Sequence, residues 1–328
     1  LYSRAYSDTA GNPGSAVTTG TGSVTVDKTA PALSSVAIVS DNTPNTTAKL
    51  GSEITLSFTA SETIGTPTVT FLSGGNAINN TVSYANDGND WTAKYIVHTS
   101  DTDGSVTYSI AYSDTAGNPG SAVTTGSGSV TVDKTAPTLN TVTIASNNSI
   151  NTEKAKENDV ITLSFTASET ITTPTVSFSI GSTVVSPSVS GSGSNYTATY
   201  TVLSGQNGLV TFSISSYSDS AGNAGPTVTA LTSGSSVTVD TIAPVISQET
   251  KISTITNSTT PIYVFSSDKT GTITFDFNDT GLTVLSGNSA GDTNNNVEFD
   301  TVPEGGPYSG ITIKVTDTAG NESNILTI

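Results

Sequence analysis

The chain contains no cysteine and no methionine, and it has a single histidine. Without cysteine, neither a disulfide framework nor a thiolate metal site is possible. The histidine, His98, has no partner serine, cysteine or second histidine in a recognisable arrangement, and no phosphate-binding glycine loop occurs. These absences argue against an enzyme. They also mean that each domain must be stabilised by a hydrophobic core or by bound metal.

Positive charge is scarce as well. Ten lysine and arginine residues stand against 27 aspartate and glutamate residues, and the formal net charge is -17. Because the basic residues are spread singly, no basic patch exists to neutralise phosphates, and we expect no nucleic acid and no anionic membrane surface as partner. No apolar run approaches the roughly 20 residues that cross a bilayer, so this segment has no predicted membrane span. The acidity instead suits the attraction of cations.

What the chain has in abundance is alternation of apolar residues with serine and threonine. In residues 53–61, Ile54, Leu56 and Phe58 point to one side, and threonine and serine point to the other. This period of two is typical of strands with one buried face. About seven such short segments occur in roughly 100 residues, separated by glycine, asparagine, aspartate and proline turns. The sequence therefore predicts an all-β fold of tandem immunoglobulin-like β-sandwiches in an extended array.

The chain also repeats itself. Residues 5–31 recur as residues 111–137 with one difference, Thr21 against Ser127, which gives a period of about 106 residues. Looser copies of parts of this block occur at 217–223, 239–244 and 315–321. Periodicity on this scale indicates a series of self-similar modules rather than one enzyme fold.

Module boundaries follow from the VDKTAP segments at 26–31 and 132–137, which close a last strand and enter the next module through a stiffening proline. We expect four parts, in which a truncated preceding module contributes its last two strands and three further modules follow, the last one shorter and divergent. Their ranges are 1–27, 28–133, 134–240 and 241–328.

The VDKTAP linkers, the FTASETI strands at 58–64 and 165–171, and the DTAGN turns resemble the bacterial immunoglobulin-like repeats of large cell-surface adhesins. The resemblance covers essentially the whole chain. It implies a secreted, cell-surface or filamentous location in which the modules form a structural stalk. As partners we expect neighbouring modules of the same chain, and the further candidates are identical chains in a filament and a surface glycan or receptor.

Acidic residues recur at the ends of the predicted sandwiches. In an immunoglobulin-type sandwich, the loop after the second strand and the loop between the last two strands lie where the chain enters. We therefore predict three metal sets, of which the third depends on a strand register that can slip by one residue. They are Asp27, Glu62 and Asp114; Asp133, Glu169 and Asp219; and Asp240, Asp268 and Asp317.

Hard oxygen ligands of this kind suit Ca²⁺, which takes 6–8 of them. The resemblance points the same way, because several adhesins of this type are rigidified by Ca²⁺ between modules. The alternative is that DTAGN is a tight turn only, in which the aspartate bonds to its own backbone. Lys28 and Lys134 then neutralise the neighbouring acids as surface ion pairs. Both interpretations stay open at this point.

Other residues carry weaker hypotheses. The cluster of Asp101 and Asp103 is best interpreted as a hairpin turn, and the equivalent aromatics Trp91 and Tyr196 as core residues. A glycan-binding role is the alternative function, for which the divergent last module offers Tyr263, Phe265 and Tyr308. A third possibility is polymerisation, in which the two leading strands complete a neighbouring subunit's sheet.

Overall fold

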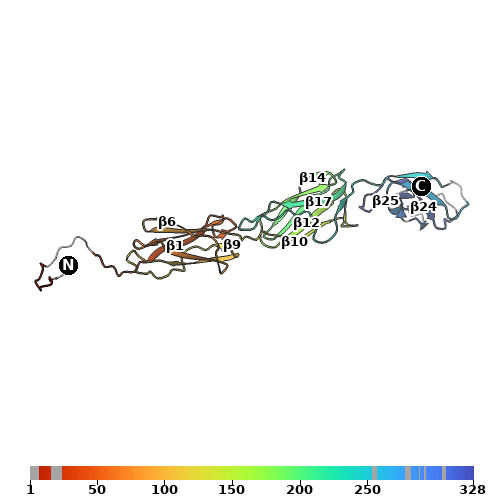
Figure 1. Ribbon diagram of the computed structural model, residues 1–328. Helices are drawn as coiled ribbons and strands as arrows, with labels where there is room; N and C mark the ends of the chain where they lie inside the picture. Colours follow the sequence, from red (N-terminus) through yellow and green to blue (C-terminus); the bar gives the residue numbers. More distant parts are fainter. Residues whose placement is uncertain are drawn as a thin grey trace. The chain divides into compact units, whose positions relative to one another are not determined.

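The computed structural model describes residues 7–15, 24–252, 257–277, 282–287, 289–291, 293–304 and 308–328. These residues form strands joined by turns and loops (Figure 1), and no helix occurs among them. The chain divides into two compact units, Leu1–Lys134 and Thr135–Ile328. The first unit holds one two-sheet sandwich and the second unit holds two, and each sandwich has its own hydrophobic core.

The first sandwich consists of a four-stranded and a five-stranded sheet. The first sheet has the order β1 (Leu33–Ser40), β3 (Glu53–Ala60), β7 (Asp90–Ile96) and β6 (Ser83–Asp87). The second has the order β2 (Thr47–Ala48), β9 (Thr131–Val132), β8 (Gly104–Ala111), β4 (Thr68–Ser73) and β5 (Asn76–Ala77). All neighbours pair antiparallel except β2 and β9, which are parallel. The consecutive strands β1 and β2 lie at the edges of different sheets.

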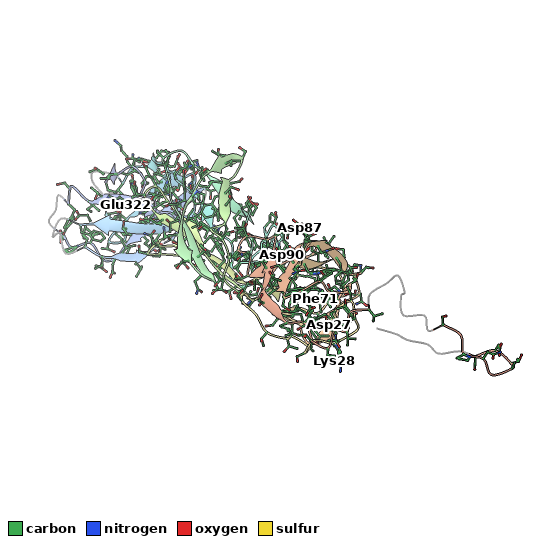
Figure 2. The ribbon with its side chains drawn as sticks, turned by 90° about the vertical axis from the view of Figure 1, so that its left-hand side faces the viewer. Asp27, Lys28, Phe71, Asp87, Asp90 and Glu322 are labelled. Atoms are coloured by element: carbon green, nitrogen blue, oxygen red, sulfur yellow. The ribbon has the colours of Figure 1, made fainter. Side chains whose placement is uncertain are left out.

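The alternation of the sequence explains the packing of these strands. In β3, Ile54, Leu56 and Phe58 are buried, and the threonine and serine residues between them are half-buried on the other face. Phe71 of β4 lies inside the sandwich (Figure 2), and its ring centroid is 4.9 Å from that of Tyr95 on the opposite sheet. Each side chain of this size contributes roughly 1.5–3 kcal/mol through removal from water.

The second sandwich repeats this topology strand for strand. One sheet has the order β10 (Leu139–Ser146), β12 (Val160–Ala167), β16 (Asn195–Thr201) and β15 (Ser188–Ser192). The other has the order β11 (Lys154–Ala155), β18 (Thr238–Val239), β17 (Gly208–Ser215), β13 (Thr175–Ile180) and β14 (Thr183–Val185). Trp91 and Tyr196, predicted as core residues, are both buried in their sandwiches, which confirms that interpretation.

The third sandwich is smaller in the part of the chain that the structure describes. Its sheets have the orders β19 (Ile246–Thr250), β20 (Ile262–Ser267), β24 (Asn294–Phe299) and β22 (Val284–Ser286), and β23 (Ser289–Ala290), β21 (Gly271–Asp276), β25 (Thr312–Thr316) and β26 (Leu326–Thr327). Tyr263 and Phe265 lie in its core. Neither ring is therefore available to a glycan.

The predicted fold class is confirmed, since the chain is an all-β array of tandem immunoglobulin-like sandwiches. The first sandwich has nine strands rather than about seven, because β2 and β5 are pairs of residues too short to produce an alternating pattern. Within residues 7–15, the structure records a single bridge between Ser7 and Pro13 rather than a strand. Among the described residues, no helix has the length and hydropathy of a membrane span.

Candidate metal centre

The DTAGN motifs and the DSAGN variant at 219–223 form the same turn, in which an aspartate side chain bonds to residues that follow it. In the first sandwich, Asp114 accepts the backbone N–H of Asn118 on Oδ1 at 2.8 Å and the Asn118 amide on Oδ2 at 2.7 Å. The Asn118 amide bond is the main reason that the pKa of Asp114 lies below its ordinary value, with help from backbone N–H groups of the turn. Gly117, at φ +93°, supplies the left-handed residue that the turn requires.

Asp8, Asp219 and Asp317 make the same two kinds of bond to the asparagine four residues later. The tight-turn interpretation is therefore correct as far as local structure goes. It does not exclude a metal, because each carboxylate oxygen has more than one acceptor site. Asp114, Asp219 and Asp317 are all buried by their surroundings, so the turn presents its carboxylate toward the sandwich end and not toward bulk water.

The entering linker lies against this turn. Asn118 uses its side-chain amide a second time, donating to the backbone carbonyl of Asp27 at 3.3 Å. The Asp27 carboxylate accepts the N–H of Thr29 at 2.9 Å, which fixes its direction. The linker is held again further on, where Ser61 exchanges hydrogen bonds with Ala32.

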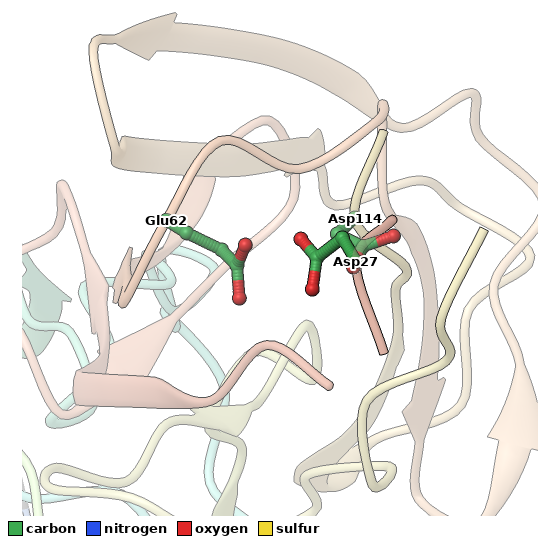
Figure 3. A group of neighbouring side chains, drawn as sticks. All are labelled: Asp27, Glu62 and Asp114. Atoms are coloured by element: carbon green, nitrogen blue, oxygen red, sulfur yellow. The ribbon is translucent and has the colours of Figure 1, made fainter. Parts of the chain in front are cut away.

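Glu62 follows Ser61 at the end of β3 and completes the group. Figure 3 shows its carboxylate pointing toward those of Asp27 and Asp114. One oxygen from each of these three residues lies within 4.8 Å of the others. The structure therefore brings together the first of the predicted acidic sets.

No cation balances this group among the described residues. None of their ion pairs includes Asp27, Glu62 or Asp114, and none includes Lys28, which follows Asp27 in the chain. Lys134, the equivalent of Lys28, contacts its own sandwich: its Nζ donates to the carbonyls of Thr99 and Asp101 and lies 3.5 Å from Asp103. Among the described residues, Lys28 therefore does not neutralise the first acidic group as an ion pair, and Lys134 is paired with Asp103.

In the second unit, Glu169 and Asp219 repeat the arrangement of Glu62 and Asp114, with carboxylate oxygens within 4.8 Å. Ser168 exchanges hydrogen bonds with Thr138 as Ser61 does with Ala32, so the loop has the same conformation. Asp133, the third member of the predicted set, belongs to the first unit. Its backbone N–H there donates to the Ala48 carbonyl at 2.8 Å.

The third predicted set differs. Asp268 accepts the N–H of Val245 at 2.7 Å and donates its own N–H to the same residue, which is the position that Ser61 and Ser168 occupy. The register is therefore shifted by one residue, and Asp268 does not join Asp240 and Asp317. Lys269 stands in the glutamate position instead, with Nζ 2.7 Å from Asp240 Oδ2 and 3.3 Å from Asp317 Oδ2.

A signal for this shift is present in the sequence. The buried positions of β20 are Tyr263, Phe265 and Ser267. They align with Leu56, Phe58 and Ala60 of β3, and the second residue after that series is Glu62 in one strand and Lys269 in the other. Counting from the buried face therefore identifies Lys269, whereas the nearest acid suggested Asp268.

Two other hollows are lined mostly by strand residues of the first and second sandwiches. One of about 260 Å³ is lined by residues of β12, β15 and β16, including Phe165 and Tyr196, and one of about 280 Å³ lies beside Glu53 and Lys94. Lys94 and Glu53, which both line the second hollow, form an ion pair at 2.7 Å. Neither contains a group of residues that suggests catalysis.

The comparisons with known proteins show solved structures of similar fold, but they match no family. No protein-family model matches the chain, and no curated protein matches it. Among solved structures, three immunoglobulin domains of titin, I67–I69 in an E-to-A variant, are 14% identical over 91% of this chain and 96% of that chain, with a TM-score of 0.40.

A complex of Dpr2 Ig1–Ig2 with DIP-Theta Ig1–Ig3 is 14% identical over 91% of this chain and 98% of that chain, with a TM-score of 0.31. Fibronectin(III)-like modules of Clostridium thermocellum CbhA are 16% identical over 62% of this chain and 93% of that chain, with a TM-score of 0.25. All three are structures of immunoglobulin or fibronectin(III)-like domains.

Proposed function

We propose that this chain is a segment of the stalk or filament of an extracellular bacterial adhesin, built from bacterial immunoglobulin-like modules, and that Ca²⁺ stiffens the entry to a module. The observation that carries the proposal is the meeting of Asp27, Glu62 and Asp114, because one of these acids belongs to the linker and two belong to the sandwich. An ion bound by all three would tie the linker to the module.

The spacing of the three carboxylates fits a single calcium ion. Ca²⁺ binds oxygen at 2.3–2.6 Å, so two ligands of one ion lie at most about 5 Å apart. The three oxygens lie within 4.8 Å of one another. They supply a charge of minus three to a dication, and backbone carbonyls and water complete its 6–8 ligands.

The mechanical consequence follows from charge. A bound ion would attract all three carboxylates, and it would thereby hold the linker against the sandwich. Without it, three like charges at this separation repel one another, and the linker is held by the Asn118 and Ser61 hydrogen bonds alone. Loss of calcium therefore loosens the joint without unfolding the module, whose core is separate.

A stalk is also what the remaining surface supports. The two hollows of about 260 and 280 Å³ are smaller than the usual ligand pocket of about 300–1,000 Å³, and two of the three aromatics considered for glycan binding are core residues. The extracellular location, the bacterial family and assembly with identical chains rest on the resemblance of the linker and turn motifs, and they belong to the same proposal.

Calcium titration of the whole chain tests the proposal. Isothermal calorimetry of the unmodified chain should show saturable binding, and Glu62→Gln should reduce it by one site or weaken it at least about tenfold. Asp87→Asn is the matched control, because Asp87 is an exposed carboxylate at the turn between β6 and β7 (Figure 2).

Small-angle scattering supplies the mechanical readout. The maximum dimension and the flexibility of the chain should change when a chelator is added to the calcium-loaded protein. In Glu62→Gln, the same addition should produce a smaller change. An unchanged scattering profile for the unmodified chain would remove calcium from the proposal and leave a metal-free stalk.

A further inference from the structure

A positive charge of the protein itself occupies the third acidic site. Lys269 Nζ is bonded to both carboxylate oxygens of Asp240, at 2.8 and 2.7 Å, and to Asp317 Oδ2 at 3.3 Å. It also donates to the backbone carbonyl of Ile242. Asp240 and Ile242 belong to the linker, and Asp317 belongs to the turn, so the ammonium group joins the same two elements that a metal would join at Asp27 and Asp114.

The surroundings of this site match the first one closely. Asn321 donates to the linker carbonyl of Asp240 at 2.9 Å, as Asn118 does to that of Asp27. Asp268 binds the linker at Val245, where Ser61 binds it at Ala32. Lys269 therefore takes the place of Glu62 in an otherwise conserved local structure within this chain.

The charge count is also the same. Three carboxylates with one dication carry a net charge of minus one, and so do two carboxylates with one ammonium group. A change from glutamate to lysine removes one ligand and supplies the cation in the same step.

We propose that Lys269 is a tethered replacement for the divalent ion, so that the joint before the third sandwich closes without metal while the site at Asp27 requires it. This inference rests on the proposed function for the role of calcium at the first site, but its own content is that the third joint is independent of calcium. A chain with both kinds of joint would keep one of them closed when calcium is withdrawn.

Further contacts within the second unit support a closed joint. The Asn148 amide of the second sandwich donates to the Ala319 carbonyl of the third at 2.8 Å. Lys156 Nζ donates to the neighbouring Gly320 carbonyl, also at 2.8 Å. Both contacts meet the turn that carries Asp317, so that the turn is bonded to the preceding sandwich as well as to the linker.

The protonation state of Lys269 is secure at neutral pH. Burial by itself lowers the pKa of the ammonium group, but the hydrogen bonds and charges of Asp240, and then of Asp317, outweigh it and raise the pKa above the ordinary value. The ammonium group is therefore charged at neutral pH.

Hydrogen–deuterium exchange of the whole chain, with calcium and with a chelator, tests the inference at each joint separately. In the unmodified protein, amide exchange at residues 317–321 should be the same in both conditions. Lys269→Met should accelerate this exchange about tenfold or more both in calcium and in chelator, because a neutral side chain leaves the negative charges of Asp240 and Asp317 without a cation.

Lys269→Glu should rebuild an acidic set with Asp240 and Asp317. We expect rapid exchange at residues 317–321 in chelator, slow exchange in calcium, and one more calcium bound per chain than in the unmodified protein. Should this variant fail to fold, the unmodified chain and Lys269→Met still decide the matter.

The inference is overturned if chelator accelerates exchange at residues 317–321 of the unmodified chain, or if Lys269→Met leaves that exchange unchanged. Exchange at residues 114–118 reports on the proposed function independently. Insensitivity to calcium there would count against calcium at Asp27, Glu62 and Asp114, and would leave the result at Lys269 standing.

Discussion

Glu62→Lys should convert the first site into a copy of the third. The substituted side chain starts from the same place in the loop as Lys269, because Ser61 and Asp268 make equivalent bonds to the linker. Its ammonium group would then lie between Asp27 and Asp114. The charge of the three side chains would change from minus three to minus one without any metal.

Two magnitudes follow. Calcium loses one carboxylate ligand and meets a positive charge, so affinity at this site should fall at least about a hundredfold, since ligand charge sets the affinity of such sites over several orders of magnitude. Ion pairs at partly exposed positions contribute about 0.2–1 kcal/mol each. A domain of about 100 residues melts about 4–8 °C higher for each kcal/mol gained, so in chelator Glu62→Lys should raise the melting temperature of the first sandwich by about 1–8 °C for each ion pair that forms.

Differential scanning calorimetry in calcium and in chelator measures both effects, with Glu62→Gln as the comparison that removes the negative charge without adding a positive one. We expect the order of stability in chelator to be Glu62→Lys, then Glu62→Gln, then the unmodified chain. The reasoning is refuted if Glu62→Lys binds calcium as tightly as the unmodified chain, or if it melts below Glu62→Gln in chelator.

Three further predictions concern the frame that holds the site. Gly120→Ala should destabilise the first sandwich by about 1–3 kcal/mol in urea unfolding, because its Cβ would lie 2.2 Å from the Tyr112 ring, whereas Gly65→Ala, with its nearest atom at 3.9 Å, should have little effect. Tyr95→Phe should leave the free energy of unfolding in urea unchanged or raise it by about 1 kcal/mol, because the buried Tyr95 hydroxyl has no hydrogen-bond partner among the described residues. A loss of more than about 1 kcal/mol would contradict this and indicate an ordered water bonded to the hydroxyl. Because the pKa of Asp114 is lowered in the folded chain, its ionised carboxylate stabilises the fold above the ordinary carboxyl pKa of about 3.8, and this stabilisation is lost as the pH falls through the lowered pKa. Asp114→Asn should therefore make the free energy of unfolding fall less steeply at acid pH. An unaltered fall would contradict this.

The fold was largely predictable because its cause is local. Ile54, Leu56 and Phe58 alternate with polar residues, and a strand with that pattern buries one face wherever it pairs. The repeat then extends one sandwich to the others. The short strands β2 and β5 were missed, since two residues do not define a period.

The acidic group was predictable for a different reason. Glu62 and Asp114 are 52 positions apart, so only the assumption of an immunoglobulin-type topology brings them together. Where the repeat is faithful, that assumption led to a group that the structure contains. In the divergent last module it led to Asp268, because the motif alone does not show which residue ends the buried face of β20.

Diffraction from crystals of the chain grown in calcium tests the central claim most directly. The account predicts an anomalous peak between Asp27, Glu62 and Asp114, with oxygen ligands at about 2.3–2.6 Å, and none between Asp240 and Asp317, where Lys269 lies. Carboxylates of the first site that face water with no ion between them, at a calcium concentration well above a millimolar, would contradict it.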